Sequence, residues 1–312
     1  MSVAVCLLLY SLTTLFAGPP LLRELTRYGH APRFGVAAWL TAIGSVLLTW
    51  LVAVGMIVVG VASRWNYPRV VAASCLARLR GVVTDNAGAA KMVLAAIVAA
   101  LVLLVASAGV RLARTLWRMR TRTHEHAEAV RLVGHRTADA YVVVEAEEPA
   151  AYCVPGRPPA IVVTSAALAA LDDDELAAVL AHERAHLTGH HSLVLTMLRG
   201  VAAVFPKFTL MRDGATQVAR LLEMCADDAS ARRHGSGALL SGLITMCRAA
   251  PAGVLAASEV AVLARAERLS VPTGDPAIAR ARAALTSVVA VMVAGPFMIG
   301  ALAASGVLLC GM

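Results

Sequence analysis

Uncharged apolar stretches, each long enough to form a membrane-spanning helix, occur four times along the chain. They cover residues 3–22, 36–62, 92–110 and 283–310. A hydrocarbon layer about 30 Å thick requires roughly 20 apolar residues in a helix, so the pattern predicts four transmembrane helices. No positive charge precedes the first stretch, and we therefore expect a retained helix there rather than a cleaved signal peptide.

Between the third and fourth stretches the pattern changes, because charges of both signs alternate with shorter apolar segments. β-Branched runs at 141–144 and 160–163 predict two strands. Apolar periodicity and glycine or proline breaks predict one helix that starts at the acidic run 172–175 and ends near Gly189. They predict further helices at 192–204, 216–233, 238–248 and 258–269.

These elements predict a mainly α fold class: a four-helix transmembrane protein with an α+β domain inserted between helices 3 and 4. The expected domains are 1–110 (three membrane helices), 111–282 (the inserted domain) and 283–312 (the fourth helix and a short C-terminus). The inserted domain is long enough to bury a core of its own.

Composition supports a membrane protein, because 59% of the 312 residues are apolar and only 15% are charged. The net charge of +8 comes mainly from scattered arginines without interleaved aromatic residues, so we expect no direct nucleic-acid partner. The cysteines form no CxxC pair and are expected to be small apolar fillers with free thiols. They are Cys6, Cys75, Cys153, Cys225, Cys247 and Cys310.

Arginines next to the apolar stretches predict the orientation, because basic residues favour the cytoplasmic side of a membrane. Those beside the first, third and fourth stretches are Arg23, Arg27, Arg33, Arg111, Arg114, Arg118, Arg120, Arg122, Arg280 and Arg282. We therefore expect a multi-pass plasma-membrane protein with a cytoplasmic central domain and both termini outside. The basic residues of the second loop oppose this orientation; they are Arg64, Arg69, Arg78, Arg80 and Lys91.

His182 and His186 lie four residues apart in the stretch HERAH, so one face of a helix presents both imidazoles to a single metal ion. Glu183 lies at the same edge. In HExxH peptidases this glutamate takes a proton from the attacking water and later delivers it to the leaving amine. The motif therefore predicts zinc-dependent peptide hydrolysis, and a merely polar helix face with two histidines is the alternative.

A catalytic zinc ion needs a third protein ligand, for which the chain offers several candidates. Ser192 occupies the position at which metzincins have a histidine, so that pattern fails. His190 and His191 are close in sequence, but their geometry for the same ion is poor. Glu223 on a second predicted helix is the better candidate, and Asp227 one turn later can fix a histidine tautomer.

AVLAHERAH followed by an ExxAD motif that starts at Glu223 resembles the gluzincin membrane peptidases, most closely the BlaR/MecR antirepressor family. DDDELAAVLAHERAHLTGHH, EMCADDASARRHG and RAERLSVP extend the resemblance over essentially the whole chain. The resemblance implies three helices, a cytoplasmic gluzincin domain and a fourth helix. It implies a Zn²⁺ ion bound by His182, His186 and Glu223, with Glu183 as general base and Asp227 in support.

The leading hypothesis is a zinc endopeptidase that cleaves a cytoplasmic protein in a signalling pathway, by family analogy a winged-helix transcriptional repressor, and that also cleaves itself. Because the chain ends at Met312 without a penicillin-binding sensor, we expect no direct β-lactam sensing. The alternatives are a quality-control protease of HtpX type and a non-catalytic receptor or scaffold with structural zinc. Expected partners are the protein substrate, the lipid bilayer and, as an open question, a second copy of the chain.

Three further expectations concern residues around the motif. His234 is a candidate for oxyanion stabilisation, although a helix-capping role is the stronger alternative. The strand at Ile161–Val163 is a candidate edge for pairing with an extended substrate. The apolar segment 193–204 between the two motifs is too short to cross a membrane.

Overall fold

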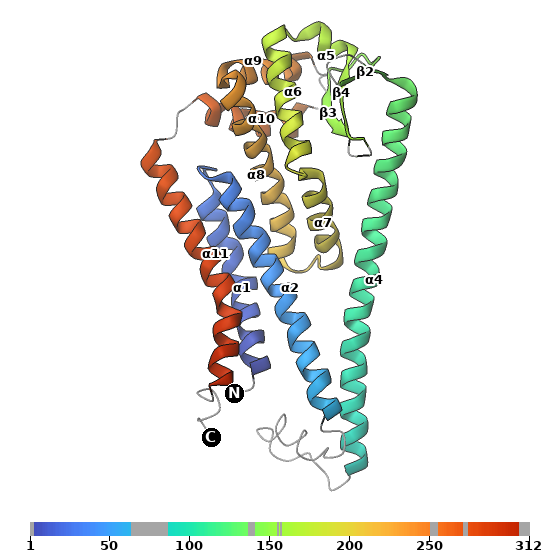
Figure 1. Cartoon of the computed structure of the whole chain (residues 1–312), viewed down its shortest axis with the longest axis vertical. Helices are drawn as coiled ribbons and strands as arrows, with labels where there is room; N and C mark the ends of the chain where they lie inside the picture. The colour runs from blue at the N-terminus through green and yellow to red at the C-terminus, as the bar shows by residue number, and fades with distance from the viewer. Residues whose placement is uncertain are drawn as a thin grey trace.

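Helices dominate the computed structural model, which describes residues 3–63, 87–136, 141–154, 156, 158–249, 255–270 and 274–305. Figure 1 shows long helices forming a bundle, with a small sheet and shorter helices at one end of it. The long helices are α1 (Val3–Thr26), α2 (Pro32–Ser63), α4 (Ala87–Val133) and α11 (Asp275–Ala304). Within the described ranges, these four helices are long and apolar enough to cross a membrane, as the pattern predicts.

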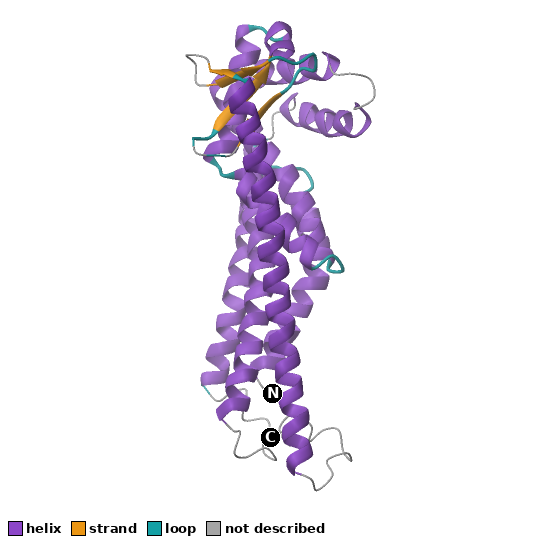
Figure 2. Cartoon of the chain, turned by 90° about the vertical axis from the view of Figure 1, so that its right-hand side faces the viewer, coloured by secondary structure: helices purple, strands orange, loops and turns teal. Residues whose placement is uncertain are grey.

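The start of α1 and the end of α11 lie together at the end of the bundle opposite the sheet (Figures 1 and 2). This arrangement agrees with the expectation that both ends of the chain lie on one side. The basic loop residues Arg64, Arg69, Arg78 and Arg80, as well as Cys75 and Cys310, lie outside the described residues. The other cysteines have free thiols, as predicted: Cys6, Cys153, Cys225 and Cys247.

Helix α4 is much longer than its predicted apolar stretch at 92–110. It continues without a break as far as Val133. The arginine-rich segment after Val110 has no proline or glycine, and arginine, leucine and alanine are good helix formers. The expected boundary between residues 110 and 111 is therefore a change in polarity along one helix rather than a change in secondary structure.

The largest buried core joins the bundle to the motif-bearing part of the chain. It combines residues of α1, α2 and α11 with residues of α7 (His191–Val204) and α8 (Thr209–His234). Its fully buried members include Leu22 and Trp39 from the bundle, and Leu210, Met211 and Leu221 from α8. Helices α7 and α8 of the inserted segment thus share a core with the apolar helices, whereas two smaller clusters around the sheet consist of residues of the inserted segment alone.

Helices α7 and α8 form a hairpin that descends beside α1, α2 and α4 (Figure 1). A Cβ atom at Gly18, in the uncharged part of α1, would lie 3.7 Å from Leu210 near the start of α8. The turn between α7 and α8 therefore lies beside the uncharged part of α1, and not beyond its end. As predicted, α7 is too short to cross a membrane, and the chain returns through α8.

Helix α8 begins at Thr209, earlier than the Thr216 expected from sequence. The pair Asp213-Gly214 has the composition of a turn. In the structure Gly214 lies inside α8, at a point where the helix packs so closely on α2 that a Cβ atom would collide with Ile43. Close packing, rather than a turn, thus explains this glycine.

The sheet contains four strands among the described residues: β1 (His135–Arg136), β2 (Tyr141–Val144), β3 (Ala151–Val154) and β4 (Ala160–Thr164). Their order is β1-β2-β4-β3, with β2 and β4 parallel and β3 antiparallel to β4. The sequence predicts β2 and β4 but not β1 or β3. The expectation of a free edge at Ile161–Val163 is wrong, because β4 lies between β2 and β3, and β3 is the edge strand.

The remaining helices are α5 (Ser165–Ala170), α6 (Asp173–Thr188), α9 (Ser236–Ala249) and α10 (Leu255–Ser270). Three of them, α6, α9 and α10, agree closely with the predicted ones, and the short helix α5 precedes them. Helix α6 starts at the acidic run and ends at Gly189, as expected. Asp172 caps it: its carboxylate accepts from the Glu175 N–H, and the Glu175 carboxylate accepts from the Asp172 N–H.

Candidate metal centre

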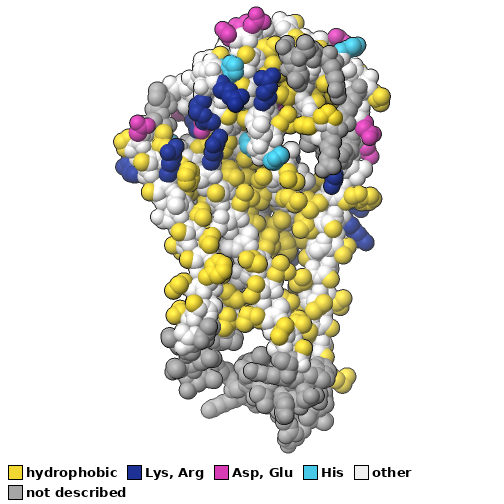
Figure 3. All heavy atoms as spheres, in the orientation of Figure 1, with side chains coloured by type: hydrophobic (Ala, Val, Ile, Leu, Met, Phe, Trp, Pro, Cys, Tyr) yellow, Lys and Arg dark blue, Asp and Glu magenta, His cyan; other side chains and the backbone are white. Residues whose placement is uncertain are grey.

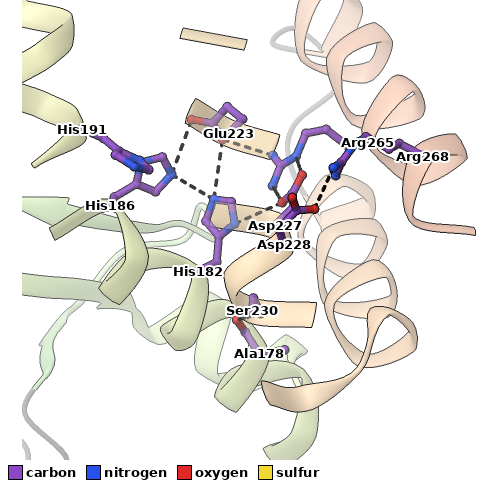
Figure 4. Close-up of polar contacts among 10 residues, drawn as sticks. All are labelled: Ala178, His182, His186, His191, Glu223, Asp227, Asp228, Ser230, Arg265 and Arg268. Atoms are coloured by element: carbon purple, nitrogen blue, oxygen red, sulfur yellow. Dashed lines mark hydrogen bonds and ion pairs between the residues drawn. The ribbon is translucent and has the colours of Figure 1, made fainter. Parts of the chain in front are cut away.

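Two histidines of α6 and a glutamate of α8 converge at the end of the bundle nearest the sheet (Figures 1 and 4). Nε2 of His182 lies 3.1 Å from Nε2 of His186. The carboxylate of Glu223 lies 3.6 Å from the first nitrogen and 3.5 Å from the second. The structure thus brings together the three residues that the sequence predicts as ligands, with one ligand atom of each within 4.8 Å of the others.

These distances fit a single zinc ion. In a tetrahedral site with Zn–N distances of about 2.0–2.1 Å, neighbouring ligand atoms are about 3.3 Å apart. Two imidazole nitrogens that face each other at 3.1 Å need a proton or a cation between them, since their lone pairs otherwise repel. Two imidazoles and one carboxylate are a known catalytic zinc set, and the 40% exposed side chain of Glu223 leaves the centre accessible.

The electrostatics of the two rings also favour a cation. Burial lowers the pKa of His186 and keeps the ring neutral, which is the form that coordinates a metal. Burial acts on His182 in the same direction, but the adjacent carboxylates of Asp227 and Glu223 outweigh it and raise its pKa to about 9. The carboxylates around His182 therefore favour positive charge, which a bound metal ion supplies in place of a proton.

Direct hydrogen bonds hold α6 against its neighbours. The hydroxyl of Ser230 in α8 donates to the carbonyl oxygen of Ala178 at 2.7 Å, in a fully buried contact. The hydroxyl of Ser241 in α9 donates to the carboxylate of the capping residue Glu175. The Ser230–Ala178 bond, one helical turn before His182, fixes the distance between α6 and α8 that the metal centre requires, and the Ser241–Glu175 bond holds α6 against α9.

Asp227 is fully buried and links the centre to α10. Its Oδ1 lies 3.1 Å from Nδ1 of His182, although the ring is not aligned for a straight hydrogen bond. The guanidinium of Arg265 donates to both carboxylate oxygens of Asp227, through Nε at 2.9 Å and through Nη2. Nη1 of Arg265 lies 3.5 Å from Glu223, so one arginine orients both carboxylates of α8 (Figure 4).

Replacing Arg265 with glutamine is expected to destabilise the protein by about 3 kcal/mol and to weaken zinc binding about tenfold, because Asp227 then carries an unpaired buried charge. Thermal unfolding and zinc titration of the purified protein measure both effects. Arg268→Gln is the comparison, since it breaks the more exposed ion pair with Asp228 and should retain zinc affinity. Equal zinc affinity in the Arg265 and Arg268 variants would contradict the proposed role of Arg265.

Glu183 lies between the metal centre and the edge strand β3. Burial raises its pKa to about 7, opposed by the charge of His182 and reinforced by that of Glu223. The backbone of Cys153 in β3 lies close enough to the carboxylate to act in the opposite direction and lower this pKa. The predicted catalytic glutamate is thus beside both the metal ligands and the strand.

The backbone of β3 is open on the side that faces Glu183. Thr164 donates its N–H to the carbonyl oxygen of Ala150, which defines one hydrogen-bonded pair of the β3–β4 ladder. Alternation along an antiparallel pair then turns the backbone groups of Ala151 and Cys153 away from β4. An extended peptide can pair with this edge beside the catalytic glutamate.

His191 has a supporting position that the sequence did not predict. Its Nδ1 lies 2.9 Å from Nδ1 of His186, the nitrogen that does not face the other ligands. His191 is buried at the start of α7, whereas His190 is exposed and adopts a left-handed conformation with φ of 51°. His191 therefore fixes the ring of His186 as Asp227 fixes that of His182.

Replacing His191 with alanine is expected to weaken zinc binding by about 10- to 100-fold, because the ring of His186 loses its hydrogen-bonding partner. His190→Asn is the matched control, since asparagine tolerates the left-handed conformation and the side chain is exposed. Competition with a chromogenic zinc chelator measures the two affinities. The assignment would be wrong if both variants bound zinc as tightly as the parent.

His234 does not lie at the centre. It ends α8, eleven residues after Glu223, which separates the two by about 16 Å along the helix axis. The oxyanion role considered for His234 is therefore incorrect. It lies in the basic last turn of α8, next to the terminating Gly235, and its helix-capping role stays a prediction.

The fold and site together define a metallopeptidase of the HExxH type with a downstream glutamate. The model of peptidase family M48 matches residues 113–288, more than half of the chain. This protein therefore belongs to peptidase family M48 and is a zinc metallopeptidase, a hydrolase that acts on peptide bonds. The narrower resemblance to BlaR/MecR antirepressors is not established by this match, and neither the curated proteins nor the solved structures gave a match.

Proposed function

We propose that this chain is a membrane-embedded endopeptidase that cleaves extended protein segments at the membrane surface. His182, His186 and Glu223 would hold the zinc ion, whose chemistry is to polarise a water molecule and the peptide carbonyl. Glu183 would accept the proton of the attacking water and return it to the leaving amine. The edge of β3 at Ala151 and Cys153 would align the substrate backbone.

The observation that carries this proposal is the position of the metal centre along the axis of the helix bundle, relative to the end of α1. Arg220 of α8 donates to the carbonyl oxygens of Thr26 at 2.7 Å and Arg27 at 2.9 Å, where α1 ends. Glu223 follows Arg220 by three residues, about 5 Å along the helix axis. The metal centre therefore lies within about one helical turn of the level at which α1 ends.

The arginines at this level support a cytoplasmic active site. Figure 3 shows Lys and Arg side chains gathered in a band above the apolar surface of the bundle. Basic residues favour the cytoplasmic side of a membrane. We therefore propose a multi-pass plasma-membrane protein with its active site on the cytoplasmic side.

Two substrate classes are candidates, one from the family resemblance and one from the position of the site. The resemblance of the HERAH and ExxAD segments to antirepressor peptidases supports a transcriptional repressor as substrate, with self-cleavage as a second activity. The site level supports an alternative, the clearance of damaged membrane proteins, because bonds close to the membrane lie within its reach. A non-catalytic scaffold is set aside, since membership of peptidase family M48 defines a peptidase.

Comparison of new N-termini in cells producing the parent chain or Glu183→Gln tests the proposal. We expect cleavage sites that depend on Glu183 and lie on the cytoplasmic side. One dominant DNA-binding protein among the substrates supports signalling, and fragments of many membrane proteins support quality control. New termini confined to external segments would contradict the proposed orientation.

A further inference from the structure

A pocket of about 440 Å³ lies between the end of α1 and the middle of α8, and half of its lining residues are arginines. Its lining residues are Pro20, Arg23, Glu24, Arg27, Gln217 and Arg220. Arg212 and Asp213 lie beside it, since Asp213 pairs with both Arg23 and Arg212. Even with both carboxylates counted, the four arginines leave an excess of positive charge. The chemistry of this lining suits an anion.

The arginines of the pocket differ in how far the protein already uses them. Arg220 is fixed, because two of its guanidinium nitrogens donate to the last carbonyl oxygens of α1. Arg23 is 50% exposed and pairs with Asp213 at 3.3 Å. Arg27 has no ion pair among the described residues and stacks on the ring of Tyr28, 5.4 Å from its centroid. Arg23 and Arg27 thus have donors left for a ligand.

The pocket lies where phospholipid headgroups are expected. The uncharged stretch of α1 ends at Leu22, so Arg23 is its first charged residue. Twenty helical residues cover about 30 Å, the thickness of the hydrocarbon layer. A basic pocket directly beyond that layer and between helices is the type of site that binds anionic headgroups.

The face of α1 below the pocket is apolar and exposed. Leu12, Phe16 and Pro20 succeed one another at intervals of four residues, so they share a face with Arg23, and Arg27 directly follows the end of α1. The side chains of Leu12 and Phe16 are 50% and 74% exposed. One face of α1 therefore offers contacts for acyl chains and, directly beyond them, guanidinium groups for a phosphate.

From these observations we propose that the α1–α8 pocket binds the phosphate group of an anionic phospholipid. The acyl chains lie along Leu12 and Phe16, and the phosphate accepts hydrogen bonds from Arg23 and Arg27. Because α8 also carries Glu223, the bound lipid holds the metal-binding helix at a fixed level relative to the membrane. The site is independent of the peptidase substrate, so a lipid-binding measurement can fail without affecting the proposed function.

The test uses the full-length chain in detergent, with native mass spectrometry of bound phosphatidylglycerol against phosphatidylcholine. The parent should retain phosphatidylglycerol selectively. Arg23→Gln with Arg27→Gln should lower its affinity about 25-fold, and Arg27→Gln alone about fivefold. The single variant leaves the Arg23–Asp213 pair intact, so it remains informative if the double variant does not fold.

Arg232→Gln with Arg233→Gln is the matched control, because it removes the same charge from the exposed end of α8. The control should bind phosphatidylglycerol as the parent does. Equal loss in both double variants would overturn the proposal, since general charge would then explain the binding. Displacement of the lipid by millimolar inorganic phosphate would also overturn it, because the site would then take the free ion.

Discussion

Replacing Glu183 with glutamine is expected to lower kcat/KM for peptide hydrolysis by a factor of about 10³ while leaving the zinc content unchanged. Glutamine keeps the shape of the side chain but cannot accept the proton of the attacking water. The metal ligands His182, His186 and Glu223 are separate residues, and they retain their positions in this variant. Loss of activity with full metal content would therefore assign the proton transfer to Glu183.

Cleavage of a fluorogenic peptide by the purified protein, together with zinc determination by atomic absorption, measures this result. Asp174→Asn is the matched control, because it changes an exposed carboxylate in the first turn of the same helix. The control should retain full activity. A Glu183→Gln enzyme that cleaves at the parental rate would exclude Glu183 as the general base.

Replacing Glu223 with alanine is expected to weaken zinc binding by more than about 100-fold, because the remaining two histidines leave the tetrahedral set incomplete. Activity should fall with the metal content and recover partly in excess zinc, which distinguishes this variant from Glu183→Gln. Removal of the carboxylate also frees Arg265 from one of its two partners, while its bonds to Asp227 remain. The fold should therefore persist without the metal.

Zinc titration and activity assays at increasing zinc concentration measure the Glu223 effect. Glu267→Gln in α10 is the control, because its side chain is exposed and lies on the helix that carries Arg265. The control should bind zinc with parental affinity. If Glu223→Ala retained stoichiometric zinc at low free concentration, another residue would have to be the third ligand.

The parts of the fold that could be predicted from sequence depend on local signals. The apolar stretches, the cap at Asp172 and the terminating glycines Gly189 and Gly235 depend on neighbouring residues alone. The structure has a long helix over each stretch, α6 between Asp172 and Gly189, and the end of α8 at Gly235. The ligand set could also be predicted, because His182 and His186 are four residues apart and share a helix face. Glu223 and Asp227 on α8 have the same four-residue spacing.

The parts that could not be predicted depend on contacts between distant segments. Strand β3 carries no β-branched run, and pairing with β4 defines it. Arg265 reaches Asp227 across 38 residues of sequence, so no spacing rule identifies it. The early start of α8 at Thr209 similarly depends on its packing against α2, where Gly214 allows the close approach of Ile43.

The sequence marks His191 as a weak ligand candidate, with a solvated or hydrogen-bonded side chain as the alternative, but it does not identify a hydrogen-bonding partner. Helix α6 ends at Gly189, and the left-handed residue His190 turns the chain before α7 starts. This break brings His191 back towards the far side of the His186 ring instead of one turn along the same helix. A glycine directly after the HExxH helix, followed by histidines, is the signal that could have indicated such a return.

Anomalous diffraction at the zinc absorption edge, recorded from crystals of the full-length protein, tests the central claim most directly. We predict one anomalous peak between α6 and α8, about 2.0–2.1 Å from Nε2 of both His182 and His186 and about 2.0–2.2 Å from the carboxylate of Glu223. A peak coordinated by other residues, or none at this position in zinc-loaded active protein, would contradict the account.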